Sequence, residues 1–280
     1  MSKSPVNGID GPNVAYNAWQ FRQILGRGVH GILLCQAESA DAVKEFVRAC
    51  RFPHHKAGVD KIGIGSRGRG SEPTAAPIWG IDQQEYFARC EPWPLAPQGE
   101  LLLGVKIESP PGVEHCEEIL AVPGLGFAEL GPGDLGLSLG YTSLQRRPYP
   151  PEMERARARV FSACKWNKLA FLEGAPADKI AASLDEGVRI ISGHNPEVAK
   201  IGRAHQKRAM PVEGRAPAFE GACNSWKISR QASSGSSSTS LAAKRATRQP
   251  SCCMDWVRPA SSSPSSSITS FFVVQAKAAR

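Results

Sequence analysis

The chain has 280 residues, enough for one α/β barrel or two small domains with a sizeable buried core. Its formal net charge of +8 belongs to the C-terminal part, because residues 215–280 carry nine Lys or Arg and two Asp or Glu, whereas residues 1–214 carry 25 and 24. No apolar run approaches the roughly 20 residues of a membrane-spanning helix, and no signal-peptide pattern opens the chain. We therefore expect a cytoplasmic protein with no membrane partner.

The predicted elements alternate between strands and helices. The first 13 residues contain Gly8, Gly11 and Pro12 and predict an irregular segment. Apolar runs predict strands over residues 29–34, 101–108, 125–131, 169–172 and 188–192. Helical periodicity predicts helices over residues 14–25, 40–49, 81–90, 113–120, 151–166, 177–184 and 196–206, with a long loop over residues 52–78. Nearly all-apolar strands between helices indicate a parallel α/β sheet.

The composition changes after about residue 211. Residues 215–280 contain 16 serines, little periodicity and a Ser/Arg/Lys bias, so we expect residues 212–280 to be a disordered tail. A basic tail of this kind is able to contact nucleic-acid phosphates. Neither interleaved aromatic residues nor a folded module accompany it, so a nucleic-acid partner is not expected and stays an alternative.

The cysteines indicate the redox environment. None of the first five forms a Cys-x-x-Cys pair, and several lie in apolar or helical runs. Buried free thiols in a reducing compartment are favoured over disulfides. The eight are Cys35, Cys50, Cys90, Cys116, Cys164, Cys223, Cys252 and Cys253.

Two acidic residues occupy matching points of consecutive strand–helix units. Glu108 closes one apolar run, and Asp134 follows the next, 26 residues later. Parallel strands joined by helical crossovers place their C-terminal ends side by side, so the two carboxylates are expected to converge. Paired carboxylates suit a Mg²⁺ or Mn²⁺ ion. The alternative is that both are ordinary strand-end carboxylates that cap helices.

Three segments together resemble one family. Residues 28–34 (GVHGILL), 103–109 (LGVKIES) and 131–141 (GPGDLGLSLGY) are similar to the HpcH/HpaI aldolases, and the resemblance extends over residues 14–211. It implies a (β/α)8 TIM barrel and a metal-dependent carbon–carbon lyase. Such an enzyme cleaves or forms the aldol of a 2-oxo acid such as pyruvate, with an aldehyde partner, through a metal-stabilised enolate. It also implies a homo-oligomer if the barrel is complete.

The resemblance implies roles for individual residues. Glu108 and Asp134 match the two metal-binding carboxylates. The turn Gly131, Pro132 and Gly133 matches the segment that holds the substrate's carboxylate. Lys106 stands where many relatives have Gln, and is expected either to reach the substrate oxygen or to pair with Glu108. Arg67, in an Arg-Gly-x-Gly loop, is expected near the mouth as a catalytic residue that meets an anionic substrate.

The chain departs from the family pattern in two places. The family's first two strands, which include the His of an Asp-x-Glu-His-Gly motif, have no match in this sequence. The family's next strand carries an Arg, but residues 5–10 contain none, and Gly8 lies near its place. We therefore expect residues 14–211 to form a partial barrel, as in a fragment of a longer enzyme. An inactive relative that acts as a binding or assembly subunit is the alternative function.

Other candidate residues favour structural roles. His30 lies within a strand pattern and is expected to pack, and the adjacent His54 and His55 rarely ligate one metal together. His194 follows a strand end, where substrate contact is a minor possibility. The Gly-rich segment from Gly65 lacks the strand and helix of a nucleotide-binding loop. Four aromatic residues are expected to pack the long loop: Trp79, Tyr86, Phe87 and Trp93.

Overall fold

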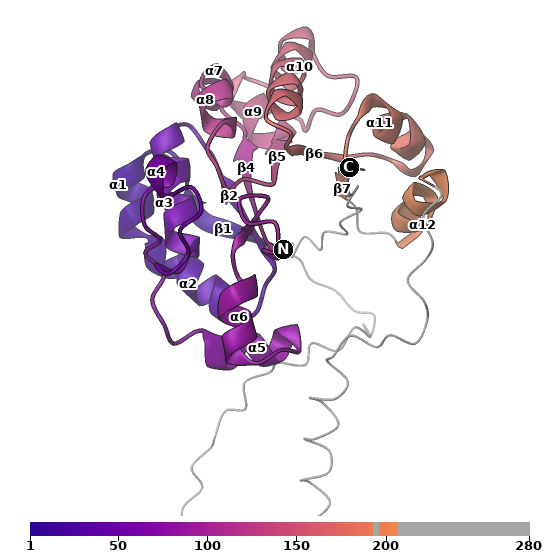
Figure 1. Ribbon diagram of the computed structural model, residues 1–280. Coiled ribbons are helices and arrows are strands. Elements are labelled where there is room, and N and C mark those ends of the chain that lie inside the picture. Colours follow the sequence, from indigo (N-terminus) through magenta and orange to yellow (C-terminus); the bar gives the residue numbers. More distant parts are fainter. Residues whose placement is uncertain (193–195, 207–280) are drawn as a thin grey trace, which may run out of the picture. The chain divides into compact units, whose positions relative to one another are not determined.

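A parallel sheet organises the chain (Figure 1). The computed structural model describes residues 1–192 and 196–206. Within them seven strands form one sheet in the order β1-β2-β4-β5-β6-β7, with β3 also paired to β4, and every pairing is parallel. The strands are β1 Ser2–Asn7, β2 Gly31–Cys35, β3 Pro92–Trp93, β4 Leu101–Ile107, β5 Phe127–Leu130, β6 Ala170–Gly174 and β7 Ile190–Ser192.

Helices connect these strands. Ser39 caps the start of the predicted helix over residues 40–49, because its side chain accepts a hydrogen bond from the backbone N–H of Ala42. The helices are α1 Gly11–Tyr16, α2 Ala18–Gly26, α3 Ala40–Cys50, α4 Val59–Ile62, α5 Glu72–Trp79, α6 Gln83–Arg89, α7 Pro110–Glu114, α8 Cys116–Leu120, α9 Pro132–Ser138, α10 Pro151–Trp166, the 3-10 turn η1 Ala177–Lys179, α11 Ile180–Glu186 and α12 Pro196–His205.

The N-terminal segment differs from the prediction of an irregular stretch. The five predicted strands all form, but residues 2–7 form β1 as well, parallel to β2, with Lys3 opposite Leu33. In β1 the side chains of Ser4 and Val6 are buried, whereas those of Lys3 and Pro5 are exposed. The strand alternates with a period of two, but its polar residues conceal the pattern.

The long loop predicted over residues 52–78 is also corrected, since it contains α4 and α5. Helix α5 tolerates Pro73 in its first turn and a second proline, Pro77, in its interior, and it ends at Gly80, whose φ of 70° is left-handed. Glycines and prolines on both sides conceal this helix from a reading of periodicity. The predicted helix 14–25 divides at Asn17 into α1 and α2.

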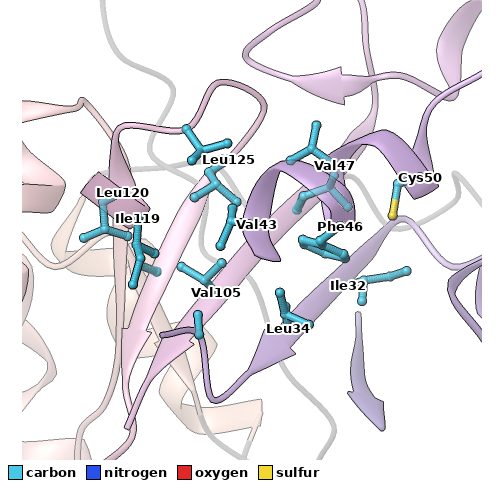
Figure 2. Packing of buried hydrophobic residues seen from close by; sticks show 14 of the residues in the cluster. Ile32, Leu34, Val43, Phe46, Val47, Cys50, Val105, Ile119, Leu120 and Leu125 are labelled. Carbon is cyan, nitrogen blue, oxygen red and sulfur yellow. The ribbon is translucent and has the colours of Figure 1, made fainter. Parts of the chain in front are cut away.

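The sheet has two different faces. Helices cover one face and enclose the main core, in which Val43, Phe46 and Val47 of α3 lie over Ile32 and Leu34 of β2 (Figure 2). The other face holds a smaller apolar cluster made of Leu33, Phe127, Leu172 and Ile190. Because successive strand side chains alternate, Lys106, Glu108 and Glu129 belong to this second face.

One arginine joins three elements near the C-terminal ends of the strands. Arg157 of α10 is 4% exposed and donates to Glu173 of β6 at 2.7 and 2.9 Å. It also donates to Glu186 of α11 at 2.7 and 2.9 Å. We call these three residues the Arg157 clamp. Its four charge-assisted hydrogen bonds fix α10, β6 and α11 against one another.

Several smaller predictions concern packing. His30 stacks on Trp79 with ring centroids 4.0 Å apart, so its predicted packing role is confirmed. The five cysteines in the described residues are free, four of them buried. In the same part of the chain no helix combines the length and apolar character needed to cross a membrane. His194 and residues 212–280 lie outside the described residues.

Candidate functional site

The two predicted carboxylates meet at the C-terminal edge of the sheet. Glu108 directly follows β4, and Asp134 lies in the first turn of α9, which follows β5. The two strands are neighbours, with Ile107 opposite Leu130. Burial raises the pKa of Glu108, Lys106 opposes this rise, and a contact with the Asp134 side chain adds to it. The structure therefore brings together the two residues that the sequence paired.

Both oxygens of Glu108 are engaged by the protein. The side chain is 2% exposed, and its Oε1 accepts a hydrogen bond of 2.9 Å from the backbone N–H of Gln36. Gln36 has a left-handed φ of 49°, a conformation that is uncommon for residues other than glycine and that often marks functional sites. The other oxygen, Oε2, forms an ion pair of 2.7 Å with Lys106 Nζ. Of the two roles expected for Lys106, pairing with Glu108 is the one that the structure shows.

Gly131 leaves the space in which these groups meet. A Cβ atom at this position would lie 2.5 Å from Glu108 Oε2 and 2.8 Å from Lys106 Cε, so any side chain would displace the ion pair. The backbone N–H of Gly131 donates to the carbonyl of Ile107 at 2.8 Å. This bond holds the turn against the end of β4.

The turn retains two backbone donors. Gly131 has already used its N–H, and Pro132 has none. The N–H groups of Gly133 and Asp134 lie in the first turn of α9, where a helix offers no carbonyl partner. Of the predicted turn, these two amides are therefore the backbone donors able to bind an anionic group.

Glu129 is a member of the site that the sequence did not single out. It lies opposite Lys106 in the pairing of β5 with β4. Its Oε2 is buried and has no hydrogen-bond partner among the described residues. Burial raises the pKa of Glu129, and the charge of Lys106 opposes that rise. Its spacing of two residues from Phe127 and from Gly131 was the available signal, because it places Glu129 on the second face of the sheet, with Phe127.

A cavity of about 870 Å³ opens beside the site at the ends of β5, β6 and β7. Glu129 and Pro132 form its wall on the side of the carboxylates, and Gly174 and Ser192 lie at the ends of the other strands. Arg147, which pairs with Glu173 at 3.2 Å, also lines the cavity. The cavity reaches Glu129 and Pro132, but neither Glu108 nor Asp134 lines it.

Arg67 lies elsewhere, which corrects the expectation that it is near the mouth. Its side chain is 0% exposed and donates to Cys90 Sγ at 2.8 Å, Ser71 Oγ at 2.7 Å and Tyr86 Oη at 2.8 Å. Its guanidinium carbon lies 4.4 Å from the centroid of the Phe52 ring. This is the interior of the aromatic cluster, where the predicted packing by Tyr86 is confirmed.

Chain direction explains the position of Arg67. Helix α3 starts just after the C-terminal end of β2 and runs back, so its last residues lie at the N-terminal ends of the strands. Arg67 N donates to the carbonyl of Arg51, which directly follows α3. Arg67 therefore lies at the opposite end of the sheet from Glu108.

Comparison with known proteins points to one enzyme family. The chain matches the HpcH/HpaI aldolase/citrate lyase family over residues 12–192. It is 28% identical over 174 residues to the hydroxypyruvate/pyruvate aldolase of Roseobacter denitrificans, covering 62% of this chain and 60% of that protein. It is 30% identical over 162 residues to the 2-keto-3-deoxy-L-rhamnonate aldolase of Klebsiella pneumoniae, covering 58% and 54%.

A solved structure shares the fold. The HpcH/HpaI aldolase/citrate lyase family protein of Burkholderia cenocepacia superimposes with a TM-score of 0.50 at 23% identity, covering 71% of this chain and 79% of that one. The expected TIM-barrel type of α/β fold is thereby confirmed. The chain spans between half and two thirds of the length of the two relatives named above. Since the family match covers most of its residues, the chain belongs to the HpcH/HpaI aldolase/citrate lyase family.

Proposed function

We propose that this chain is a class II, metal-dependent aldolase, a carbon–carbon lyase that cleaves or forms the aldol of a 2-oxo acid such as pyruvate with an aldehyde. The observation that carries the proposal is the meeting of Glu108 and Asp134 at the C-terminal edge of the sheet. Enzymes with parallel sheets bind their ligands at this edge. Family membership and two relatives named as aldolases support the same activity.

The carboxylate pair fits a divalent cation. Glu108 and Asp134 would hold Mg²⁺ or Mn²⁺, which prefer carboxylate oxygens. The missing Cβ of Gly131 leaves room beside Glu108 Oε2. When bound, the ion would supply Lewis-acid polarisation of the carboxylate and keto oxygens of a 2-oxo acid.

The chain's own groups would orient the substrate. The N–H groups of Gly133 and Asp134 point out of a helix start, where a carboxylate is stabilised. Gly131 and Pro132 would shape this turn without donating to the substrate. The cavity bounded by Glu129 and Pro132 would receive the aldehyde portion.

An inactive relative that binds without catalysis is the second candidate, and crowding around Gly8 favours it. A Cβ atom at Gly8 would lie 2.9 Å from Leu34 Cδ2 and 3.0 Å from Ala37 Cα. The position nearest to the family's substrate-gripping Arg therefore has no room for a side chain. A role for the basic tail in nucleic-acid binding concerns residues outside the described part.

The test measures proton exchange at the methyl group of pyruvate. In D₂O with Mg²⁺, the proposal predicts deuterium incorporation that NMR detects. Glu108→Gln and Asp134→Asn are expected to slow it at least 100-fold and to abolish saturable Mn²⁺ binding. Glu118→Gln, which changes an exposed carboxylate on α8, is the control and is expected to match the unmodified protein. Metal-dependent exchange that survives both site variants would overturn the assignment, and Mn²⁺ binding without exchange would favour the inactive relative.

The cellular setting forms part of the proposal. Five free cysteines in the described residues agree with a reducing compartment, and thus with a cytoplasmic protein. We also propose a homo-oligomer, which analytical ultracentrifugation of the full chain would reveal as a mass that is a multiple of 30.1 kDa.

A further inference from the structure

Lys106 occupies one of the two carboxylate oxygens of Glu108, a residue that we propose holds a metal ion. Its Nζ lies 2.7 Å from Glu108 Oε2, and the other oxygen of Glu108 is bonded to the backbone of Gln36. A divalent cation held by Glu108 would therefore meet an ammonium group at the same oxygen. Two cations on one buried carboxylate oxygen repel strongly, so Lys106 must move if a metal ion is to bind Glu108 Oε2.

Glu129 offers Lys106 a second partner. The two residues lie opposite each other on neighbouring strands, whose backbones are about 4.8 Å apart, and their side chains share the second face of the sheet. No ion pair joins them in the described structure, and Glu129 Oε2 is buried without a hydrogen bond. A rotation of the flexible lysine side chain is sufficient to bring its ammonium to that oxygen.

The charges around Lys106 also favour its movement towards Glu129. Burial lowers the pKa of Lys106, but the charge of Glu129 and then that of Glu108 outweigh it and raise the pKa. Glu129 thus already attracts the ammonium from a distance. Glu108, Glu129 and Asp134 with Lys106 carry a formal charge of −2, which one divalent cation neutralises.

We propose that Lys106 is a movable counter-ion that leaves Glu108 for Glu129 when a divalent metal binds. Glu129 is then a positioning residue: it makes metal binding possible by accepting the ammonium and does not ligate the metal itself. Without metal, Lys106 stabilises the buried Glu108. This inference rests on the proposed metal site at Glu108 and Asp134.

The test is a double-mutant cycle on Mn²⁺ affinity, measured from the free Mn²⁺ signal in electron paramagnetic resonance with the full chain. Glu129→Gln is expected to weaken Mn²⁺ binding at least 10-fold, because Lys106 loses its alternative partner. Lys106→Met is expected to tighten binding. In the Lys106→Met background, Glu129→Gln is expected to change the affinity by less than about 3-fold, because no ammonium then needs a new partner.

The cycle distinguishes a movement of Lys106 to Glu129 from a direct attraction between the Glu129 charge and the metal ion. If Glu129 acts only by adding negative charge near the metal, its removal weakens binding by the same factor in both backgrounds, and the proposal is overturned. An unmodified protein that binds no Mn²⁺ overturns both this proposal and the metal site. If Glu108→Gln abolishes Mn²⁺ binding but the cycle is additive, the metal site stands and only the movement of Lys106 to Glu129 is overturned. Near-ultraviolet circular dichroism checks that each variant is folded.

Discussion

Substitution of Arg67 tests whether this buried side chain stabilises the fold or binds the substrate. Its guanidinium donates three hydrogen bonds, each to a neutral group, and lies 4.4 Å from the Phe52 ring centroid and 5.5 Å from that of Tyr86. Three such bonds contribute about 1 kcal/mol each, and two stacked rings add about 1 kcal/mol each. The desolvation of the charge offsets part of this total.

We expect Arg67→Ala to lower the free energy of unfolding by about 4 kcal/mol, since it also leaves a cavity. Arg67→Met keeps the length of the side chain and removes the buried charge, so about 2 kcal/mol is expected. Urea unfolding followed by tryptophan fluorescence measures both. Arg69→Met is the matched control, because the Arg69 side chain is 78% exposed and its ion pair with Glu72 contributes at most about 1 kcal/mol.

The opposite result would refute this reasoning. If Arg67 met the substrate at the mouth, Arg67→Ala would leave the urea midpoint nearly unchanged and abolish pyruvate exchange. A structural Arg67 gives the reverse: a lowered midpoint, with exchange retained in the fraction that stays folded.

Two further predictions follow from local geometry. Gly131→Ala places a Cβ atom 2.5 Å from Glu108 Oε2 and is expected to weaken Mn²⁺ binding at least 10-fold. Titration of that variant with Mn²⁺, followed by electron paramagnetic resonance, measures the change. An unchanged affinity would show that the metal site does not need the close approach of the Gly131 backbone to Glu108. Arg159 donates to both oxygens of Glu117 at 2.8 Å and lowers the pKa of Glu117 to about 2. The folded pKa lies below the ordinary value of about 4.3, so this pair contributes stability above pH 4.5 that is lost as the pH falls towards 2. Both side chains are about half exposed, so the contribution is below about 1 kcal/mol. Unfolding of Glu117→Gln at several pH values should therefore show a shallower loss of stability in acid, and an acid limb identical to that of the unmodified protein would contradict the assignment.

The sequence was sufficient where a local pattern determines position. Apolar runs located β2, β4 and β5, and the rule that parallel strands end together placed Glu108 near Asp134. Neither inference needed the path of a helix or the register of two strands. The proximity of Glu108 and Asp134 thus follows from the direction of parallel strands alone.

The errors arose where tertiary context decides. β1 alternates polar and buried residues, and it is recognisable only once β2 is present as its partner. The position of Arg67 depends on where α3 returns the chain. Glu129 becomes part of the site only through its register with Lys106. Pairing between strands far apart in sequence is not encoded in any short motif.

The Arg157 clamp has a consequence for motion. A single guanidinium joins β6, α10 and α11, and all three elements supply residues that line the cavity. Opening any one of them breaks charge-assisted bonds to another, so the three are expected to fluctuate as one cooperative unit. That side of the cavity would then keep its shape before any ligand arrives. Adaptation to substrates of different size would fall to the loop between α9 and α10, whose Arg147 pairs with Glu173 and Glu186 of the clamp.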